Sequence, residues 1–308
     1  MKLNLPSPVQ EVHNPHYLEK GVRVFVKRDD LIHPLISGNK WRKLKFILSK
    51  AQREAKNHLV TFGGAYSNHL LACAAAANYN GLPCTGIVRG EDVKNEILYK
   101  CTALGMKLIF VGRESYRYKH QIFEDLFGKD DQAYFIDEGG ASEQAVEGCE
   151  EIVNELDSTF DHIFCAAGTG STAAGILAAI KKQKLSTRLQ VIPVLKDGDF
   201  LKQAIEKYTA PDASFELHQN YHFGGYAKYN DQLLDFIIDY YHQHQILLDQ
   251  IYTAKLVFGL DDLIRSDFFK PGEQLLWIHT GGKTGLLGIR KNLTAKAPEF
   301  RQILEEIL

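Results

Sequence analysis

His162-Ile163-Phe164-Cys165-Ala166-Ala167-Gly168-Thr169-Gly170-Ser171-Thr172 is the stretch that decides the fold of this chain. The run His162–Cys165 is predicted as a strand, and the glycines that follow mark a tight turn. Small residues after Thr172 predict a helix. Strands and helices alternate in this way along most of the sequence, which predicts an α/β fold with parallel sheets.

The alternation can be followed from end to end. Further strands are predicted at Gly21–Lys27, Leu59–Phe62, Thr85–Val88, Lys107–Val111, Ala133–Ile136, Leu189–Leu195 and Gln274–Ile278. Helices are predicted from Ser37 and from Ser67 onward, at Glu96–Leu104, Tyr118–Phe127, Glu143–Leu156 and Phe200–Tyr208, at about 230–245 and 253–266, and after Gly282.

Size and charge restrict the classes of function. A chain of 308 residues usually forms two domains or lobes. Its 36 Lys and Arg residues nearly balance its 38 Asp and Glu residues, which argues against a nucleic-acid or polybasic membrane surface. The five cysteines form no CxxC pair, as is typical of reduced cytosolic thiols. No apolar run suits a signal peptide or a membrane span, so we expect a soluble cytoplasmic protein.

Gly168–Thr172 carries the clearest ligand signal. Its glycines let the backbone approach a ligand, and amides at the start of the following helix favour an anion such as a compact phosphate. A tight turn that only aids packing is the structural alternative. The run also fits G-x-G-x-x-[GA], with Ala173 in the last place, although the acidic residue expected after the next strand is poorly placed. A nucleotide-dependent oxidoreductase therefore stays open as an alternative.

Gly63-Gly64-Ala65-Tyr66-Ser67-Asn68-His69 forms a second loop of small and polar residues after a strand. Ser67 alone would serve as the N-cap of the next helix. Asn68 and His69 add side-chain donors at the start of the same helix. This cluster suits a substrate carboxylate or a phenolic oxygen of a cofactor.

Lys40 is the third notable residue. The spacing of Trp41, Leu44 and Leu48 predicts a helix with Ser37 as its N-cap, so Lys40 lies in the first turn. The positive end of the helix dipole disfavours an ammonium there. Lys40 is either a solvated basic residue or a lysine kept easily deprotonated for a Schiff base with a carbonyl cofactor.

Metal chemistry has weak support. His218 and His222 are four residues apart, but no third ligand accompanies them, so we expect no metal. Asp29 and Asp30 are either a catalytic carboxylate pair or, more commonly, residues that hold a loop by hydrogen bonding. In open parallel sheets ligands bind at the carboxyl ends of strands. We therefore expect four segments to meet at one site: Gly63–His69, Gly168–Thr172, His279–Gly282 and the helix that carries Lys40.

Taken together, these motifs resemble the pyridoxal-phosphate enzymes of the tryptophan-synthase-β-like fold (fold type II). The resemblance is closest to the 1-aminocyclopropane-1-carboxylate deaminase/D-cysteine desulfhydrase family and covers nearly the whole chain. It includes Val26–Leu31, Gly38–Leu44, Tyr252–Lys255 and His279–Gly282. It implies a homodimer with two lobes per chain, each with an open, mostly parallel sheet flanked by helices. Residues 1–44 plus 145–308 would form the large cofactor-binding domain and 45–144 the small domain.

The resemblance also implies roles for individual residues. Lys40 would carry pyridoxal 5'-phosphate, with Ser67, Tyr226 and Tyr252 as further catalytic residues. The other cofactor-binding residues would be Lys43, Asn68, Gly168, Thr169, Gly170, Ser171, Thr172, Tyr252 and Thr253. The small amino-acid substrate would be bound by Ser67, Asn68, His69, Tyr226 and Thr280.

Three positions distinguish the two branches of the family. The ring-opening deaminases carry Glu, Gln and Leu where this chain has Thr253, His69 and Thr280. A carboxylate facing the pyridine nitrogen keeps it protonated and strengthens the electron sink, whereas a threonine hydroxyl favours a neutral ring. Expelling a sulfide needs a weaker sink than opening a cyclopropane ring. The sequence therefore favours D-cysteine desulfhydrase-like β-elimination to pyruvate, ammonia and sulfide, with 1-aminocyclopropane-1-carboxylate deamination as the alternative.

Overall fold

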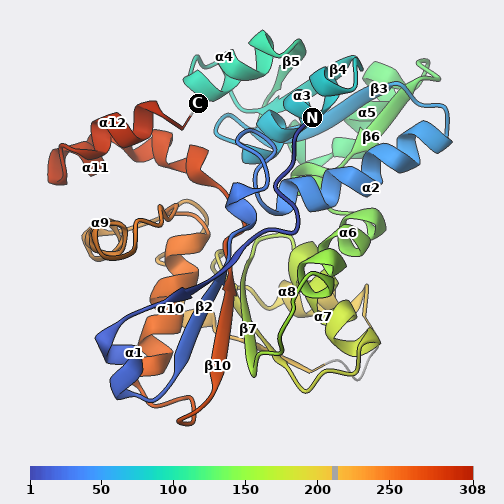
Figure 1. The fold of residues 1–308 in the computed structure, drawn as a ribbon. Helices are drawn as coiled ribbons and strands as arrows, with labels where there is room; N and C mark the ends of the chain where they lie inside the picture. Colours follow the sequence, from blue (N-terminus) through green and yellow to red (C-terminus); the bar gives the residue numbers. More distant parts are fainter. Residues whose placement is uncertain (210–213, 308) are drawn as a thin grey trace.

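Two mostly parallel sheets form the framework of the chain (Figure 1). The computed structural model describes residues 1–209 and 214–307. Residues 210–213 and 308, which belong to the predicted large domain, lie outside the described residues. The larger sheet has the order β1(Val9–Val12)-β2(Arg23–Lys27)-β10(Gln274–Ile278)-β7(His162–Ala167)-β8(Arg188–Pro193)-β9(Phe215–Leu217). The smaller sheet has the order β5(Met106–Val111)-β4(Cys84–Arg89)-β3(His58–Gly64)-β6(Ala133–Ile136). Strand β1 is antiparallel to β2, and the other recorded pairs are parallel.

Helices cover the faces of both sheets. They are α1(Pro15–Glu19), α2(Asn39–Arg53), α3(Asn68–Tyr79), α4(Glu96–Ala103), α5(Lys119–Phe127), α6(Glu143–Asn154), α7(Ser171–Lys182), α8(Phe200–Glu206), α9(Asp231–His244), α10(Thr253–Arg265), α11(Arg290–Lys296) and α12(Phe300–Glu305). Short 3₁₀ turns occur at Asp29–Leu31, Ser115–Arg117, Glu138–Gly140, Gln219–Tyr221 and Lys283–Ile289. None of the helices within the described ranges is long and apolar enough to cross a membrane.

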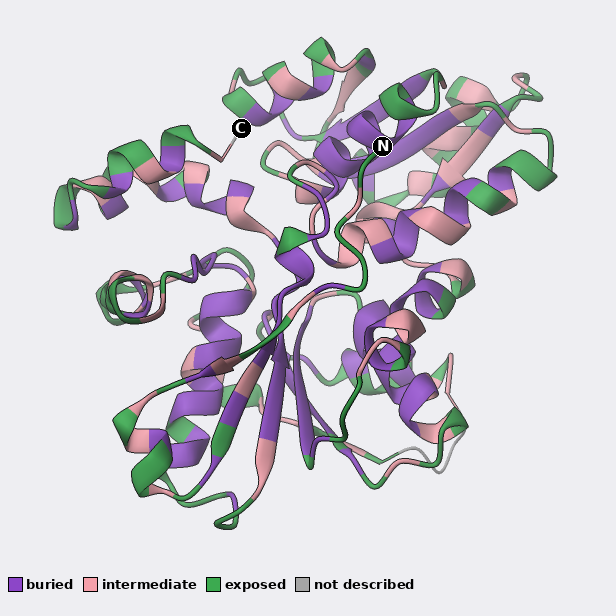
Figure 2. Cartoon of the chain, viewed as in Figure 1, coloured by how far each residue is buried: buried purple, intermediate pink, exposed green. Residues whose placement is uncertain are grey.

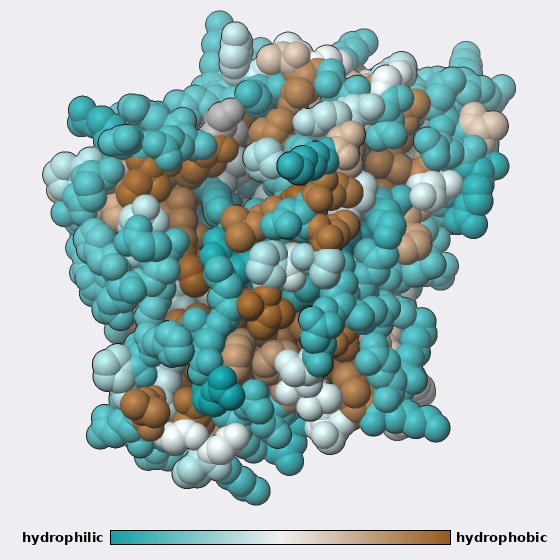
Figure 3. All heavy atoms as spheres, viewed as in Figure 1, coloured by the Kyte–Doolittle hydropathy of each residue, from teal (hydrophilic) through white to brown (hydrophobic). Residues whose placement is uncertain are grey.

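The core lies on the helix-covered faces of the sheets. Strand β7 is buried along its whole length, which explains its lack of polar–apolar alternation (Figure 2). The alanine-rich α3 is buried from His69 to Ala77, because small side chains let it lie close to its sheet. Hydrophilic residues cover most of the face in Figure 3, with apolar residues in separate patches. Strands β3 to β6 lie within residues 45–144 and the other strands outside them, and the boundary of the small domain at 45–144 stays a prediction.

Helix α6 packs against both α2 and α7 through glycines. A Cβ at Gly148 would overlap the carbonyl group of Arg42 on α2. A Cβ at Gly175 on α7 would lie 2.5 Å from Cys149 Cβ on α6. Glycine at both positions therefore sets how closely the three helices approach one another.

A buried ionic cluster fixes α2 to the large sheet. Arg42 donates to Asp29 (Nη2–Oδ1, 2.9 Å) and to Glu155 (Nη2–Oε2, 2.8 Å), and Lys27 on β2 reaches the same Glu155 oxygen at 2.8 Å. Burial alone would raise the pKa of Glu155, but the hydrogen bonds from Arg42 and Lys27 outweigh it and lower that pKa to about 2. Asp29 therefore holds structure together, as does Asp30, which pairs with Arg28 at 2.8 Å.

Most predicted elements are confirmed, with shifts of a few residues at their ends, and Gln274–Ile278 matches as predicted. Ser37 as the N-cap of α2 is wrong: Gly38 occupies that place with φ 63°, and the Ser37 hydroxyl donates to the Asp30 carbonyl (3.2 Å). A side chain at Gly38 would overlap the Thr280 carbonyl, so this close approach decides the helix start. The single helix predicted after Gly282 is a 3₁₀ turn followed by α11 and α12. The short edge strands β1 and β9 were not predicted.

Candidate active site

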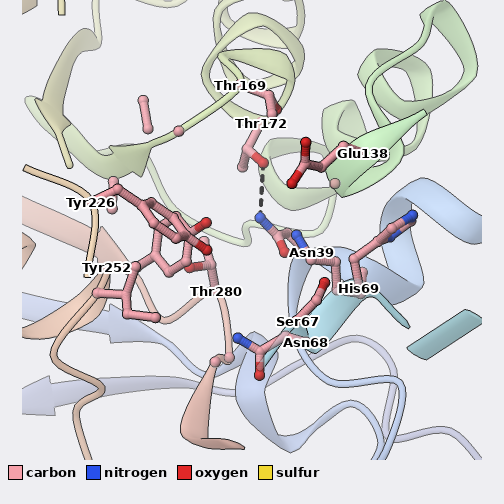
Figure 4. Close-up of a pocket in the computed structure, with 18 of the residues that line it drawn as sticks. Asn39, Ser67, Asn68, His69, Glu138, Thr169, Thr172, Tyr226, Tyr252 and Thr280 are labelled. Atoms are coloured by element: carbon pink, nitrogen blue, oxygen red, sulfur yellow. Dashed lines mark hydrogen bonds between the residues drawn. The ribbon is translucent and has the colours of Figure 1, made fainter. Parts of the chain in front are cut away.

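A cavity of about 570 Å³ opens where the carboxyl ends of strands from both sheets meet (Figure 4). All four predicted segments contribute to its lining. The predicted residues that line it are Lys40, Lys43, Ser67, Asn68, His69, Gly168, Thr169, Gly170, Thr172, Tyr226, Tyr252 and Thr280. The structure thus brings together twelve residues that are spread over more than 200 positions of the sequence.

Two lysines of α2 face the cavity without an acidic partner. Neither Lys40 nor Lys43 has a carboxylate within ion-pair distance among the described residues, and Lys43 Nζ donates only to the Gly139 carbonyl (3.2 Å). Burial, together with the neighbouring charge of Lys43, lowers the pKa of Lys40 to about 7. Burial also lowers the pKa of Lys43. Two unpaired amines in one cavity indicate a site for an anionic ligand.

The turn before α7 supplies the complementary anion cradle. Gly170 has φ 83° at the N-cap of α7, and the amides of residues 171–173 have no backbone acceptor in the described part of the chain. Thr172 Oγ1 accepts a hydrogen bond from Asn39 Nδ2 at 3.0 Å, which joins α7 to α2 beside Lys40 (Figure 4). Ser171 is fully buried beneath the lining, 3.3 Å from the Thr169 hydroxyl. The positive end of α7 is therefore directed at the cavity.

The loop after β3 presents polar groups from another side. Ser67 caps α3, as predicted, by accepting from the Leu70 amide at 3.3 Å, so its own proton remains available to a ligand. Asn68 Oδ1 accepts from the Thr284 hydroxyl, which leaves the Asn68 amide group as a donor. His69 is buried, and its Nε2 lies 2.9 Å from the Thr61 hydroxyl. Burial, with the charges of Lys40 and Lys43, holds the pKa of His69 well below its usual value, so its ring is neutral.

Two tyrosines form the opposite wall. The rings of Tyr226 and Tyr252 meet edge to face with centroids 6.2 Å apart (Figure 4). Burial raises the pKa of Tyr252 well above its usual value, so its hydroxyl remains protonated. Tyr226 is 45% exposed and lies at the cavity edge. This wall offers one flat apolar face and two hydroxyl groups.

Thr253 lies behind this wall rather than in the lining. It is fully buried, and its hydroxyl donates to Asp249 Oδ1 at 2.8 Å. Asp249 was not predicted; its carboxylate also accepts from the amides of Ile251, Tyr252 and Thr253 at 2.9 to 3.0 Å. The hydroxyl of Thr253 is therefore bonded to a buried carboxylate behind the wall and does not face the cavity.

Among the lining residues that sequence reasoning missed are three polar side chains, those of Asn39, Arg89 and Glu138. Arg89 ends β4 and Glu138 follows β6, the two strands that flank β3. Their position after parallel strands was a usable signal, but the order of strands in the sheet was needed to place them beside Ser67. No group of three His, Cys, Asp or Glu side chains suited to a metal occurs in residues 1–209 and 214–307.

Comparison with known proteins identifies the class. The model of the "pyridoxal-phosphate dependent enzyme" family matches residues 2–281. The chain belongs to this family of pyridoxal-phosphate-dependent enzymes.

Its relatives narrow the comparison. A putative 1-aminocyclopropane-1-carboxylate deaminase of Pyrococcus horikoshii is 31% identical, over 91% of this chain and 90% of that protein. The bifunctional D-cysteine desulfhydrase/1-aminocyclopropane-1-carboxylate deaminase of Arabidopsis thaliana, a mitochondrial protein, is 29% identical, over 92% and 78%. A crystal structure of an ACC deaminase homologue, 29% identical, superposes with a TM-score of 0.85 over 96% of this chain and 95% of that one. The predicted family and fold are confirmed.

The cavity fits pyridoxal phosphate on its own evidence. The unpaired lysines and the free amides of α7 match a phosphate and an aldehyde, and the Tyr252 ring offers a flat surface for an aromatic ring. An anion there would also compensate the two buried amines. The dinucleotide alternative is not supported, because the chain belongs to a family with another cofactor.

Proposed function

We propose that this protein is a pyridoxal-phosphate lyase that eliminates the β-substituent of a small amino acid, with D-cysteine as the substrate that the residues favour. Water then completes conversion to pyruvate and ammonia, while sulfide leaves from Cβ. The observation that carries the proposal is a lysine of depressed pKa, Lys40, between an anion cradle and a small polar pocket.

Individual residues have definite tasks in this proposal. Lys43, the turn Gly168–Thr172 and the start of α7 would bind the phosphate of the cofactor. Tyr252 would pack on its ring and Asn68 would face its phenolic oxygen. When bound, the cofactor supplies an electron sink that accepts the electron pair left on Cα after proton removal.

Lys40 is suited to move that proton. Because its pKa is lowered to about 7, Lys40 is a neutral amine in a far larger share of the molecules at neutral pH than an ordinary lysine is. A neutral Nζ can accept a proton from Cα, whereas an ordinary lysine would already be protonated. The hydroxyl of Ser67 and the amide of Asn68 would bind the substrate carboxylate, with the neutral ring of His69 beside them. Tyr226 would line the part of the cavity that binds the substrate, and Thr280 would limit the size of the substrate.

The choice between the two branches rests on Thr253. Thr253 stands where a ring-opening deaminase would carry Glu, so the side chain that follows Tyr252 is a hydroxyl and not a carboxylate. This favours β-elimination over deamination of 1-aminocyclopropane-1-carboxylate. The second reaction stays a candidate because relatives of this chain carry that name.

A product assay on the purified holoenzyme tests the proposal. We expect sulfide and pyruvate from D-cysteine, and slower release of 2-oxobutyrate from 1-aminocyclopropane-1-carboxylate. Borohydride should attach the cofactor mass to the Lys40 peptide. Lys40→Ala should abolish both signals, and Lys45→Ala, five residues further along the same α2 helix, should retain them. Sulfide release by Lys40→Ala at the unchanged rate, or 2-oxobutyrate as the faster product, would contradict it.

Assembly and location belong to the same proposal. The family resemblance supports a homodimer. The five buried, unpaired cysteines support a location in the reducing cytoplasm. Sedimentation equilibrium would measure the mass of the assembly directly. A monomer at micromolar concentration would refute the dimer.

A further inference from the structure

Lys255, in the first turn of α10, is a buried cation held by backbone carbonyls. Its side chain is fully buried, and Nζ donates to the carbonyl oxygens of His222 (2.8 Å) and Gly225 (2.7 Å). The Val194 carbonyl lies 3.5 Å away. No carboxylate lies within ion-pair distance of this ammonium among the described residues. Three N–H donors therefore meet three carbonyl groups.

The segment that Lys255 bonds has an unusual backbone. Phe223 (φ 52°), Gly224 (φ 91°), Gly225 (φ 119°) and Ala227 (φ 57°) all have left-handed conformations. For residues other than glycine this conformation costs about 1 to 2 kcal/mol. Such a segment needs contacts from outside to keep its shape. The two short bonds of Lys255 are to Gly225 within it and to His222 directly before it.

Tyr226 lies inside this segment. It directly follows Gly225, and its ring lines the cavity and meets Tyr252 edge to face. Lys255 follows Tyr252, the N-cap of α10, by three residues. The start of α10 therefore contacts Tyr226 in two ways, through the ring of Tyr252 and through the bond from Lys255 to the Gly225 carbonyl. The amides of Gly225 and Lys228 close the segment by donating to His222 (3.0 Å) and Gly225 (3.1 Å).

We propose that Lys255 is a positioning residue that holds Tyr226 in the wall of the active-site cavity by bonding the carbonyls of residues 222–225. The contribution of Tyr226 to substrate binding rests on the proposed function, whereas the hold on the segment does not.

A buried lysine is a costly way to fill space. Taking an ammonium out of water without an anion is unfavourable, and burial accordingly lowers the pKa of Lys255 to about 8. Methionine would occupy a similar volume without this cost. The function of the side chain must therefore lie in its hydrogen bonds to the segment.

Hydrogen exchange of the holoenzyme tests the proposal without an activity assay. In Lys255→Met we expect the amides of residues 222–228 to exchange about tenfold faster or more, while β3 (His58–Gly64) keeps its protection. We also expect KM for D-cysteine to rise more than kcat falls, because Tyr226 loses its place while Lys40 does not. Unchanged exchange in residues 222–228 would overturn the proposal, even if the protein acts on another substrate.

Chemical rescue separates hydrogen bonding from packing. Lys255→Ala removes the equivalent of propylamine, so propylammonium should restore protection of residues 222–228. Tetramethylammonium has the same charge but no N–H donor and should not restore it. The unchanged protein in each salt is the control, because primary amines also react with the cofactor aldehyde. If the variants fold poorly, refolding yield with the two salts replaces exchange as the readout. Equal effects of the two salts would refute the role of the donors.

Discussion

The Thr253 hydroxyl gives its single proton to Asp249 Oδ1 across 2.8 Å, in a place that water does not reach. The same carboxylate accepts three backbone amides at the start of α10, so its acceptor positions are filled. A threonine whose proton is committed cannot also donate it to a ring nitrogen in the cavity. Thr253 and Asp249 therefore form one hydrogen-bonded unit. Without Asp249, the hydroxyl proton of Thr253 would be free to bond another acceptor.

Thr253→Val tests this unit. It leaves Asp249 buried with one donor fewer, so we expect the free energy of unfolding to fall by about 1–3 kcal/mol. Thr253→Ser keeps the hydroxyl, so its free energy of unfolding should fall less, because only a methyl group is missing. Denaturant unfolding of the holoenzyme measures both. Equal losses in the two variants would show that the hydrogen bond contributes little.

Thr253→Glu would give this chain the residue of the ring-opening branch. The sequence alone predicts faster release of 2-oxobutyrate. The structure predicts instead that a second carboxylate beside buried Asp249 lowers the melting temperature and gives no gain in ring opening. Thr253→Gln, similar in size but uncharged, is the control and should retain more stability. A stable Glu variant with faster ring opening would restore the simpler explanation.

Lys43→Met removes one cation from the proposed binding site of the cofactor phosphate. A hydrogen bond to a charged group contributes about 1.5–3 kcal/mol. We therefore expect the Kd of the apoprotein for pyridoxal phosphate to rise about 10–100-fold. Lys45→Met, on the same helix but paired with Glu151, should bind with unchanged affinity. Titration followed by cofactor absorbance gives both constants, and equal affinities would exclude Lys43 as a phosphate ligand.

The low pKa of Lys40 has a direct signature in the apoprotein. A lysine reacts as its neutral amine, which predominates above its pKa. Labelling of Lys40 by an amine reagent should therefore increase with pH and level off above about 7, while labelling of a free Nα-acetyl-lysine standard continues to rise toward its ordinary pKa of about 10.4. Peptide mass spectrometry at short times follows the Lys40 peptide and the standard. Parallel curves for Lys40 and the standard would contradict the depressed pKa.

Stability at acid pH should depend on Glu155. Its folded pKa of about 2 lies below the ordinary value of 4.5, so its stabilising contribution is present above pH 4.5. That contribution is lost as the pH falls from 4.5 toward 2, because the unfolded chain binds the proton more readily. We expect Glu155→Gln to lower the melting temperature at pH 7 and to flatten its fall in acid. Glu147 is exposed on α6, the helix that ends directly before Glu155, and the melting temperature of Glu147→Gln should follow that of the original protein.

Local signals were sufficient for the fold and for much of the site. The apolar strands, the glycine turn at Gly168 and the Ser67 cap are read from neighbouring residues, and they lie where they were predicted. Asp249, Arg89 and the Lys255 contacts could not be found in this way. Each depends on which segments meet in space, and strand order or a carbonyl in a distant loop leaves no periodic trace in the sequence. The prediction of Ser37 as the N-cap failed for the same reason, because the contact of Gly38 with Thr280 decides where α2 begins.

The glycine contacts of α6 have a consequence for how this chain tolerates change. Lys40 and Lys43 belong to α2 and the anion cradle to α7, and α6 lies against both helices through Gly148 and Gly175. The distance between α2 and α7 across the cavity therefore depends on the absence of a side chain at Gly148 and Gly175, neither of which lines the cavity. A single methyl group at Gly148 would increase the distance between the lysines of α2 and the anion cradle of α7. Substitutions in α6 should therefore weaken cofactor affinity before they unfold the protein.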